Sequence, residues 1–343
     1  MAYTTINKST AHFNTKLYTG TGSNQAITGI GFQPDLVWWK CRNSAKNHGM
    51  TDAVRGNTKI IRSNLSDAEN TDSSYVQSFD TDGFTAGTNG NMNSSGDTFV
   101  SWSWKAAGTS GSANNDGSIA TTVAANTTAG FSIVKWTGTG SSGTLGHGLG
   151  AVPNTIWVKK TSATDDWFCW HTALGSQGKM NFNNTSAVQN DTGYWNNTTP
   201  TNQVFSVTSN GANNASGQTY IAYCFTNITG YSKFGSLTGN GSTNGTFVYC
   251  GFAPAFIIVK AKSSGNWFMY DNKRPGYNNV QQFLEADGTA TEYTSNANHS
   301  IDILSNGFKF TGGSGSNTSG RECIFMAWGQ SLVGSNNVPC TAK

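Results

Sequence analysis

The chain has 343 residues and a net charge of +3, from 21 basic and 18 acidic side chains. Only 11% of the residues are charged, and Lys and Arg are scattered rather than gathered in a stripe, which argues against a nucleic-acid-binding protein. Aromatic residues reach 12% and apolar residues recur in short alternating runs, so the chain can bury a core and is not disordered.

The N-terminal residues MAYTTINKSTAHFN have neither the basic region nor the apolar region of a signal peptide. No stretch approaches the ~18 consecutive apolar residues that a membrane-spanning helix needs. We therefore expect a protein made in a cytoplasm, without insertion into a membrane.

Four landmarks follow one another three times along the chain. The first is the motif TGxGS, which begins at Thr19, Thr137 and Thr238. The second is a proline followed by an apolar run that ends in lysine, at residues 34–40, 153–159 and 254–260. A short aromatic or acidic segment that ends in glycine comes third, at Gly56, Gly175 and Gly276, and Asn-x-Ser-Gly with an aromatic strand comes last, from Asn93, Asn214 and Asn317. A period of roughly 100 residues is the size of a domain, so the pattern predicts an internal triplication.

The run that follows each proline alternates like a β-strand. One face is apolar in every repeat and is expected to point into a core: Val37 and Trp39, Ile156 and Val158, Ile257 and Val259. The other face is half apolar and ends in Lys40, Lys159 or Lys260, so we expect it to pack on a neighbouring layer and to end at water. In the closing strands, large residues alternate with small ones, as in the inner strands of a two-sheet sandwich.

These patterns predict an all-β fold of three tandem antiparallel β-sandwich domains, lectin-like or jelly-roll-like. The expected divisions are residues 1–108, a linker with an extra strand at 109–129, the second repeat at 130–229, the third at 230–331 and a C-terminal tail at 332–343. Residues 106–130 begin as a flexible linker, whereas only TNITG, from Thr226, joins the last two repeats. The first domain is therefore expected to hinge, and the other two to form a stiffer pair.

Metal and cofactor binding find no support in the sequence. The six cysteines occupy different landmark positions in the three repeats, which indicates free thiols rather than an inherited disulfide. There is no CxxC motif or Cys/His cluster for zinc, and the DTDGF segment at Asp80 is better explained by a hairpin turn than by a calcium loop. We predict neither a metal site nor a cofactor.

Two Asp-x-x-Arg pairs are candidate ligand-binding residues. Asp52 and Arg55 lie in the first repeat, Asp271 and Arg274 in the third, and His171 stands at this place in the second. Each pair either binds a polar ligand or forms an ion pair that fixes a turn. The ion pair is the commoner use of this spacing, and the pairs are kept as a weak candidate site.

Aromatic residues just before these pairs are candidates for sugar binding. They are Trp167 and Trp170 in the second repeat and Trp267 and Tyr270 in the third. Aromatic rings near Asp, Asn and Lys can stack on a sugar while the polar groups bond its hydroxyls. The alternative interpretation is that these rings complete a hydrophobic core.

No catalytic residue is predicted. The sequence has no HExxH or GxSxG motif and no pair of carboxylates repeated with an aromatic platform, so we expect that the protein is not an enzyme. A polysaccharide depolymerase would have to use the few acids of this region: Asp165, Asp166, Asp271, Glu285 and Asp287.

The ordered set MAYTTINKS, KLYTGTGS, GFQPDLVWWK, TDAVRG, SFDTDGFTAG, SGDTFVSWSWKAAG, GHGLGAVPNTIWVKK and GYSKFGSLTGNGS resembles a family of repeat proteins of unassigned function, found in tailed phages of marine bacteria. The resemblance runs from the first residues to about Ser331. It implies a structural protein of the virion, such as a tail-fibre-like appendage, and carries no catalytic residues with it.

The resemblance and the uncharged surface together lead to three hypotheses. The first is a non-enzymatic virion protein that attaches the particle to a host-surface glycan. The second is a capsid decoration or tail-structural protein that binds other virion subunits, and the third is a depolymerase. For the first two we expect assembly in the host cytoplasm and a homo-oligomer, with a trimer favoured because symmetric assembly covers edge strands.

Overall fold

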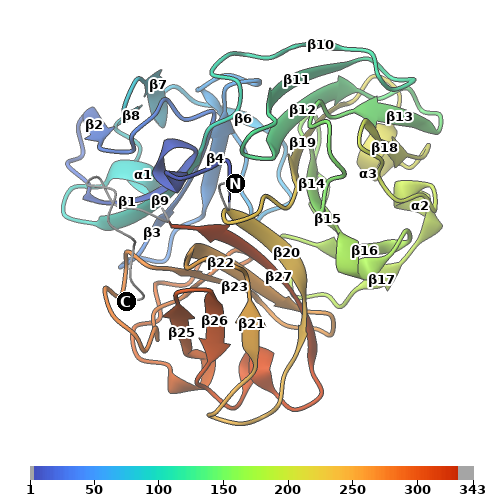
Figure 1. The fold of residues 1–343 in the computed structure, drawn as a ribbon. Helices are drawn as coiled ribbons and strands as arrows, with labels where there is room; N and C mark the ends of the chain where they lie inside the picture. The colour runs from blue at the N-terminus through green and yellow to red at the C-terminus, as the bar shows by residue number, and fades with distance from the viewer. Residues whose placement is uncertain (1–3, 331–343) are drawn as a thin grey trace.

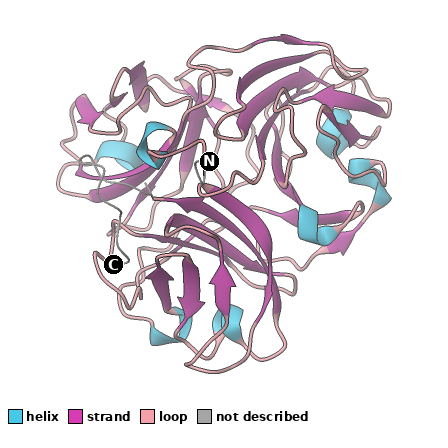
Figure 2. Cartoon of the chain, in the orientation of Figure 1, coloured by secondary structure: helices cyan, strands magenta, loops and turns pink. Residues whose placement is uncertain are grey.

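The computed structural model describes residues 4–330, and its fold is all-β, as predicted (Figures 1 and 2). In these described residues antiparallel strands pair in seven sheets, and no helix exceeds four residues. Figure 1 shows three lobes around a common centre, with one third of the chain in each lobe.

The first lobe has a four-stranded sheet, a three-stranded sheet and a short hairpin. The larger sheet has the order β1 (Phe13–Thr19), β9 (Thr98–Trp104), β3 (Leu36–Cys41), β4 (Gly49–Asp52). The smaller has the order β2 (Gln25–Thr28), β8 (Gly83–Ala86), β7 (Val76–Asp80). The hairpin pairs β5 (Lys59–Ile60) with β6 (Asn70–Thr71), and the short helices are η1 (Ser9–Ala11) and α1 (Gly90–Asn93).

The second lobe has an eight-stranded sheet and a two-stranded sheet. The larger has the order β10 (Ser112–Asn114), β11 (Thr121–Asn126), β12 (Phe131–Thr137), β19 (Thr219–Phe225), β14 (Thr155–Lys160), β15 (Phe168–His171), β16 (Gly178–Asn181), β17 (Gln189–Asn190). The smaller pairs β13 (Gly143–Gly146) with β18 (Val204–Val207). The helices are η2 (Thr172–Leu174), α2 (Thr192–Trp195) and α3 (Gly211–Asn214).

The third lobe has a five-stranded and a three-stranded sheet. The larger has the order β20 (Ser232–Thr238), β27 (Glu322–Gly329), β22 (Pro254–Ala261), β23 (Trp267–Asp271), β24 (Leu284–Glu285). The smaller has the order β21 (Phe247–Tyr249), β26 (Gly307–Phe310), β25 (Ile301–Leu304), and the helices are η3 (Ala297–His299) and η4 (Gly315–Asn317). The orders β1-β9-β3-β4, β12-β19-β14-β15 and β20-β27-β22-β23 correspond, so the repeated landmarks occupy equivalent strands.

Each lobe has its own hydrophobic cluster, and a fourth cluster joins all three lobes. We call this fourth one the central cluster; its large side chains include Phe13, Trp38, Trp102, Trp104, Phe131, Trp157, Phe225, Phe256 and Trp328. Many of these rings contact a ring from another lobe, such as Trp38 with Trp157 and Trp102 with Phe256. The three large sheets therefore bury their inward faces against one another.

The two faces of the proline-led strand point into different cores. Val37 and Trp39 and their counterparts lie in the cluster of their own lobe, as predicted. The opposite face forms part of the central cluster, with Leu36, Trp157 and Phe256 among its members. The expectation that this face ends at water is wrong, because the lysine that ends each strand is fully buried: Lys40, Lys159 and Lys260.

The expected hinge after the first repeat is also wrong, because the first repeat supplies part of the central cluster. Its Phe13 stacks on Phe256 of the third repeat, with ring centroids 5.8 Å apart. The segment expected to hold an extra strand contains β11, which pairs along its length with β12. The predicted tail at 332–343 lies outside the described residues.

The TGxGS and Asn-x-Ser-Gly motifs of each repeat dock on each other. The buried side chain of Asn214 accepts from the backbone N–H of Thr139 at 3.1 Å and donates to the carbonyl of Ser141 at 2.6 Å. Asn93 and Asn317 make the same contacts with the turns that follow Thr19 and Thr238. The most regular motifs in the sequence are therefore structural clamps that close each repeat.

The first glycine of the TGxGS motif is required by close approach. A Cβ atom on Gly138 would lie 2.2 Å from the carbonyl oxygen of Ala215, and Gly20 has the same contact with Ser94. Backbone cannot yield at this distance as a flexible side chain would, so only glycine fits.

We expect Asn214→Ala to lower the free energy of unfolding by about 1–3 kcal/mol, because it removes a fully buried side chain together with the two bonds that hold the TGxGS turn. Urea unfolding followed by tryptophan fluorescence measures the change. Asn190→Ala, at an exposed position of β17, serves as the control and should change stability by less than about 0.5 kcal/mol. Equal effects of the two substitutions would contradict the clamp.

Candidate functional residues at the contacts between repeats

All nine candidate residues lie on equivalent strands β4, β15 and β23 or in the turns beside them. Strand register places Asp52 opposite Leu36, His171 opposite Thr155 and Asp271 opposite Phe256, so these three residues are equivalent. All three are fully buried, at the border between one repeat and the next. The structure thus brings the candidates to three related places rather than to one cleft.

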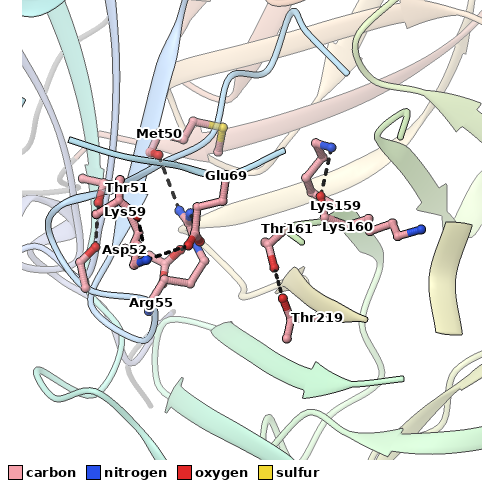
Figure 3. Close-up of polar contacts among 12 residues, drawn as sticks. Met50, Thr51, Asp52, Arg55, Lys59, Glu69, Lys159, Lys160, Thr161 and Thr219 are labelled. Carbon is pink, nitrogen blue, oxygen red and sulfur yellow. Dashed lines mark hydrogen bonds and ion pairs between the residues drawn. The ribbon is translucent and has the colours of Figure 1, made fainter. Parts of the chain in front are cut away.

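In the first repeat, Arg55 is held by two carboxylates (Figure 3). Its Nε lies 2.6 Å from Asp52 and its Nη1 lies 3.0 Å from Glu69, and the guanidinium also donates to the carbonyl of Met50. The hydroxyl of Tyr223, from the second repeat, donates to the same Asp52 oxygen at 2.7 Å. Burial lowers the pKa of Arg55, but Asp52 and the other acidic groups beside the guanidinium raise it by more, so the guanidinium stays charged where the two repeats meet.

The third repeat has the same arrangement where it contacts the first repeat. Arg274 Nε lies 2.6 Å from Asp271, and its Nη1 lies 3.5 Å from Glu292. The indole of Trp102, from the first repeat, donates to Asp271 at 3.2 Å, and Arg42 of the first repeat pairs with Glu292 at 2.7 Å. Both Asp-x-x-Arg pairs are therefore ion pairs, and their aspartates also accept hydrogen bonds from a neighbouring repeat.

The second repeat replaces the whole charged group at once. His171 occupies the place of the aspartate and Leu174 that of the arginine. Val188 occupies the place of the glutamate, because the backbone N–H groups of Glu69, Val188 and Glu292 each donate to the equivalent carbonyl of the next repeat. Burial lowers the pKa of His171 to about 4, and its Nε2 lies 3.3 Å from the carbonyl of Phe325 in the third repeat. A buried ion pair and a neutral replacement of similar shape can be similarly stable, which explains the concerted change.

Trp167 and Trp267 bond a neighbouring repeat through their indole nitrogens. Trp167 donates to the carbonyl of Arg62 at 2.8 Å, and Trp267 donates to the carbonyl of Asn181 at 2.9 Å. The equivalent residue of the first repeat is His48, whose Nε2 lies 2.9 Å from the carbonyl of Glu285. Each of the three residues therefore contacts the preceding repeat, and for the first repeat this is the third.

Trp170 and Tyr270 belong to the clusters of their own lobes. The Trp170 indole donates to the carbonyl of Gly175 at 2.9 Å, and the Tyr270 hydroxyl donates to the carbonyl of His299 at 2.9 Å. At most 2% of the surface of any of the four candidate aromatic residues is exposed. A ring that stacks on a sugar must expose a face, and the structure leaves none of these four rings with one.

The three buried lysines complete the contacts between repeats. Lys159 Nζ donates to the carbonyls of Lys160, Asp165 and, in the first repeat, Ser66, at 2.8–3.1 Å (Figure 3 shows the bond to Lys160). Lys260 reaches the carbonyl of Ser186 at 3.0 Å and Lys40 that of Thr289 at 3.3 Å. Burial lowers the pKa of each lysine to about 8.

These lysines predict a pH dependence of stability. The unfolded chain holds the proton of Lys159 up to about pH 10.5, whereas the folded chain begins to lose it near pH 8, so stability rises with pH in between. Relative to Lys159→Met, the native protein should gain about 2 kcal/mol from pH 8 to pH 10. Urea unfolding of both proteins across this range measures the difference.

The control is Lys135→Met, which changes an exposed lysine and should show the same stability difference at every pH. If the free energy of unfolding of the native protein minus that of Lys159→Met stays constant or falls from pH 8 to pH 10, the buried ammonium is contradicted.

The remaining reactive groups of the described chain are dispersed. Cys41, Cys169, Cys224, Cys250 and Cys323 are buried and free, and Cys340 lies outside the described residues. Burial raises the pKa of Cys169 and Cys250 to about 12, which makes these thiols unreactive. Within residues 4–330 no three His, Cys, Asp or Glu side chains form a group that could hold a metal ion, and no helix could span a membrane.

A family model described as a domain of unknown function, DUF7483, matches residues 8–331. The chain belongs to this family. No curated protein matches the sequence. In this DUF7483 chain the family match covers all three repeats together, in agreement with a central cluster to which each repeat contributes.

Motif spacing in the DUF7483 chain did not indicate the partners of the candidate residues. Glu69 and Glu292 complete the two arginine sites, Tyr223 and Trp102 bond their aspartates, and His48 takes the place of a tryptophan. One signal was available, because Glu69 and Glu292 are charged where the second repeat has Val188, the same repeat that lacks the Asp-x-x-Arg pair.

Proposed function

We propose that this protein is a non-enzymatic structural protein of a phage particle, exposed at its surface and used for attachment to a host-surface glycan. The observation that carries the proposal is the use of the chain's buried polar residues. Arg55, His171 and the three buried lysines each bond a neighbouring repeat, and Arg274 pairs with Glu292, which in turn pairs with Arg42 of the first repeat; this is the design of a rigid scaffold. The resemblance to virion repeat proteins supplies the setting.

In this proposal each repeat is a sandwich module from an ancestral triplication. The smaller sheet of each lobe and the outer face of its larger sheet share a cluster, as Phe84 and Trp39 do in the first lobe. The protein's partners would be other virion proteins and a glycan, and we keep a homo-oligomer, with a trimer favoured, as part of the proposal. Glycan contact then falls to the outer surface, where the most exposed large hydrophobic side chain of the described residues is Tyr277, at 82%.

The test is competition for adsorption. Purified protein at saturating concentration should reduce adsorption of the particle to its host at least tenfold, whereas an unrelated β-protein of similar charge should not. Unchanged adsorption at high protein concentration would refute the attachment role.

The second candidate is a capsid decoration or tail-structural protein that binds other virion subunits. The open edge of strand β21, described below, favours it. Quantitative mass spectrometry of particles separates the two, because decoration requires hundreds of copies per particle and a fibre only tens or fewer.

No observation favours the depolymerase. Asp166 accepts from the side-chain amides of Asn181 and Asn183, both at 2.8 Å, and Asp287 accepts from the backbone N–H of Trp267 at 2.9 Å. Asn64 and Asn183 stand at the place of Asp287 in the other repeats and bond the equivalent N–H groups of His48 and Trp167. A carboxylate that an amide replaces in two of three repeats has a structural role.

A further inference from the structure

The outer edge of β21 has unpaired backbone groups and two exposed aromatic side chains. β21 lies at the end of its sheet and pairs with β26 (Figure 1). Its neighbour Thr246 accepts from the N–H of Phe310 in β26 at 3.1 Å, and Cys250 donates to the carbonyl of Asn306, just before β26, at 2.9 Å. In an antiparallel pair the backbone groups of Phe247 and Tyr249 therefore point away from the sheet. No residue in the described part of the chain bonds these outward groups, and the two side chains are 44% and 61% exposed.

The same edge is occupied in the second repeat. There Leu145 of β13 takes the place of Val248, and Ile119 forms a parallel bridge with it. The N–H of Ile119 donates to the carbonyl of Thr144 at 3.0 Å, and Ser118 exchanges two bonds of 2.9 Å with Thr144. A short extended segment of the chain thus acts as an added strand.

The added segment also closes the core beneath the edge. Ile119 is a member of the cluster of the second lobe and leaves Leu145 with no exposure. In the third lobe Val248, Leu237 and Cys250 remain 6–7% exposed at the same border. The third lobe therefore lacks an aliphatic side chain at the place that Ile119 fills in the second.

Chain connectivity explains why this edge is empty. Ser118 and Ile119 belong to the 26 residues that separate β9 from β12. Only residues 226–231 separate β19 from β20, and Ile228 is held there by its bridge to Ser232. Six residues span about 20 Å at most and cannot also supply a strand to β21.

The first lobe offers a comparison within the same molecule. On β2 the residues equivalent to Phe247 and Tyr249 are Ala26 and Thr28, which are small. Large apolar side chains on an exposed edge favour association with another chain, and proteins usually avoid them unless they bind a partner. Among the three equivalent strands, the aromatic pair occurs only on β21.

We propose that the edge of β21 binds an extended segment of another protein by parallel strand addition. Backbone bonds to Phe247 and Tyr249 hold the segment, one aliphatic side chain takes the place of Ile119 over Val248, and the two aromatic rings cover its outer face. The proposal is independent of glycan attachment, since it concerns a protein partner.

The probe is a fluorescein-labelled peptide with the sequence of residues 114–123, which contains the segment that fills the β13 edge. Fluorescence anisotropy should show saturable binding to the full chain. Tyr249→Pro removes an outward N–H without touching the bonds to β26, and should weaken binding at least tenfold. Ala26→Pro makes the same change on β2 and should leave binding unchanged.

A second variant, Phe247→Lys, keeps every backbone group and places a charge on the edge, so it covers the case in which the proline variant does not fold. It too should weaken binding at least tenfold. No saturable binding up to millimolar protein, or equal binding to all variants, overturns the proposal. Two further outcomes would overturn the proposal if the peptide does not bind. If Phe247→Lys abolishes dimerisation of the chain, the occupant of the edge is a second copy. If Phe247→Lys abolishes glycan binding, the occupant is a sugar.

Discussion

Arg274→Leu is expected to lower the free energy of unfolding by about 3–5 kcal/mol, the cost of leaving a buried charge without its partner. Asp271 is fully buried, and Arg274 lies 2.6 Å from it. Without the arginine, the partners left within residues 4–330 are the indole of Trp102 and backbone N–H groups for Asp271, and Arg42 for Glu292. Urea unfolding at neutral pH measures the change.

The protein itself supplies the compensating variant. The triple substitution Asp271→His, Arg274→Leu and Glu292→Val copies the second repeat, and should recover at least half of the stability that Arg274→Leu loses. Lys262→Met breaks an exposed pair with Glu322 and, as a control, should cost less than about 1 kcal/mol. If the triple variant is less stable than Arg274→Leu, the three positions do not act as one unit.

Phe256→Ala is expected to cost about 3–5 kcal/mol and to loosen the first repeat as well as the third. The Phe256 ring contacts Phe13 and Trp102 of the first repeat and Trp328 of its own, with centroids 5.1–5.8 Å apart. Its removal leaves a cavity in the central cluster that neither repeat can close alone. Hydrogen exchange should therefore accelerate in β9 as well as in β27.

Phe247→Ala is the matched control, since it removes an exposed phenylalanine from the same repeat and should change stability by less than about 1 kcal/mol. Exchange that accelerates in β27 and stays unchanged in β1 and β9 would mean that the repeats unfold independently. That result would contradict a shared core.

Local pattern was sufficient to find the proline-led strand and the closing strand of each repeat. The apolar face of Val37 and Trp39, opposite a half-apolar face that ends in Lys40, predicted a strand with one face in a core, and that face packs in the cluster of its own lobe. The pattern could not predict what covers the other face, because an apolar residue such as Trp38 is expected there whether the face packs on a sheet of its own repeat or on another repeat. The lysine after it suggested water, since lysine is rarely buried without partners.

The candidate site shows the same limit. The spacing of Asp271 and Arg274 correctly suggested an ion pair, because three residues suffice to fold the arginine back on the aspartate. Their burial depends on Trp102, which lies 169 residues away in the sequence. No local pattern carries such a contact, so the rings of Trp167 and Trp267 could be weighed as a sugar platform as well as a core.

The sequence by itself determined the all-β fold and the threefold landmarks, since strand alternation and glycine turns depend on residues that are neighbours in the chain. Only the tertiary structure decided that the repeats share one central cluster, that three lysines are buried, and that the edge of β21 is open. Each of these depends on which surfaces of the repeats meet, and that is set by shape and burial across the whole chain.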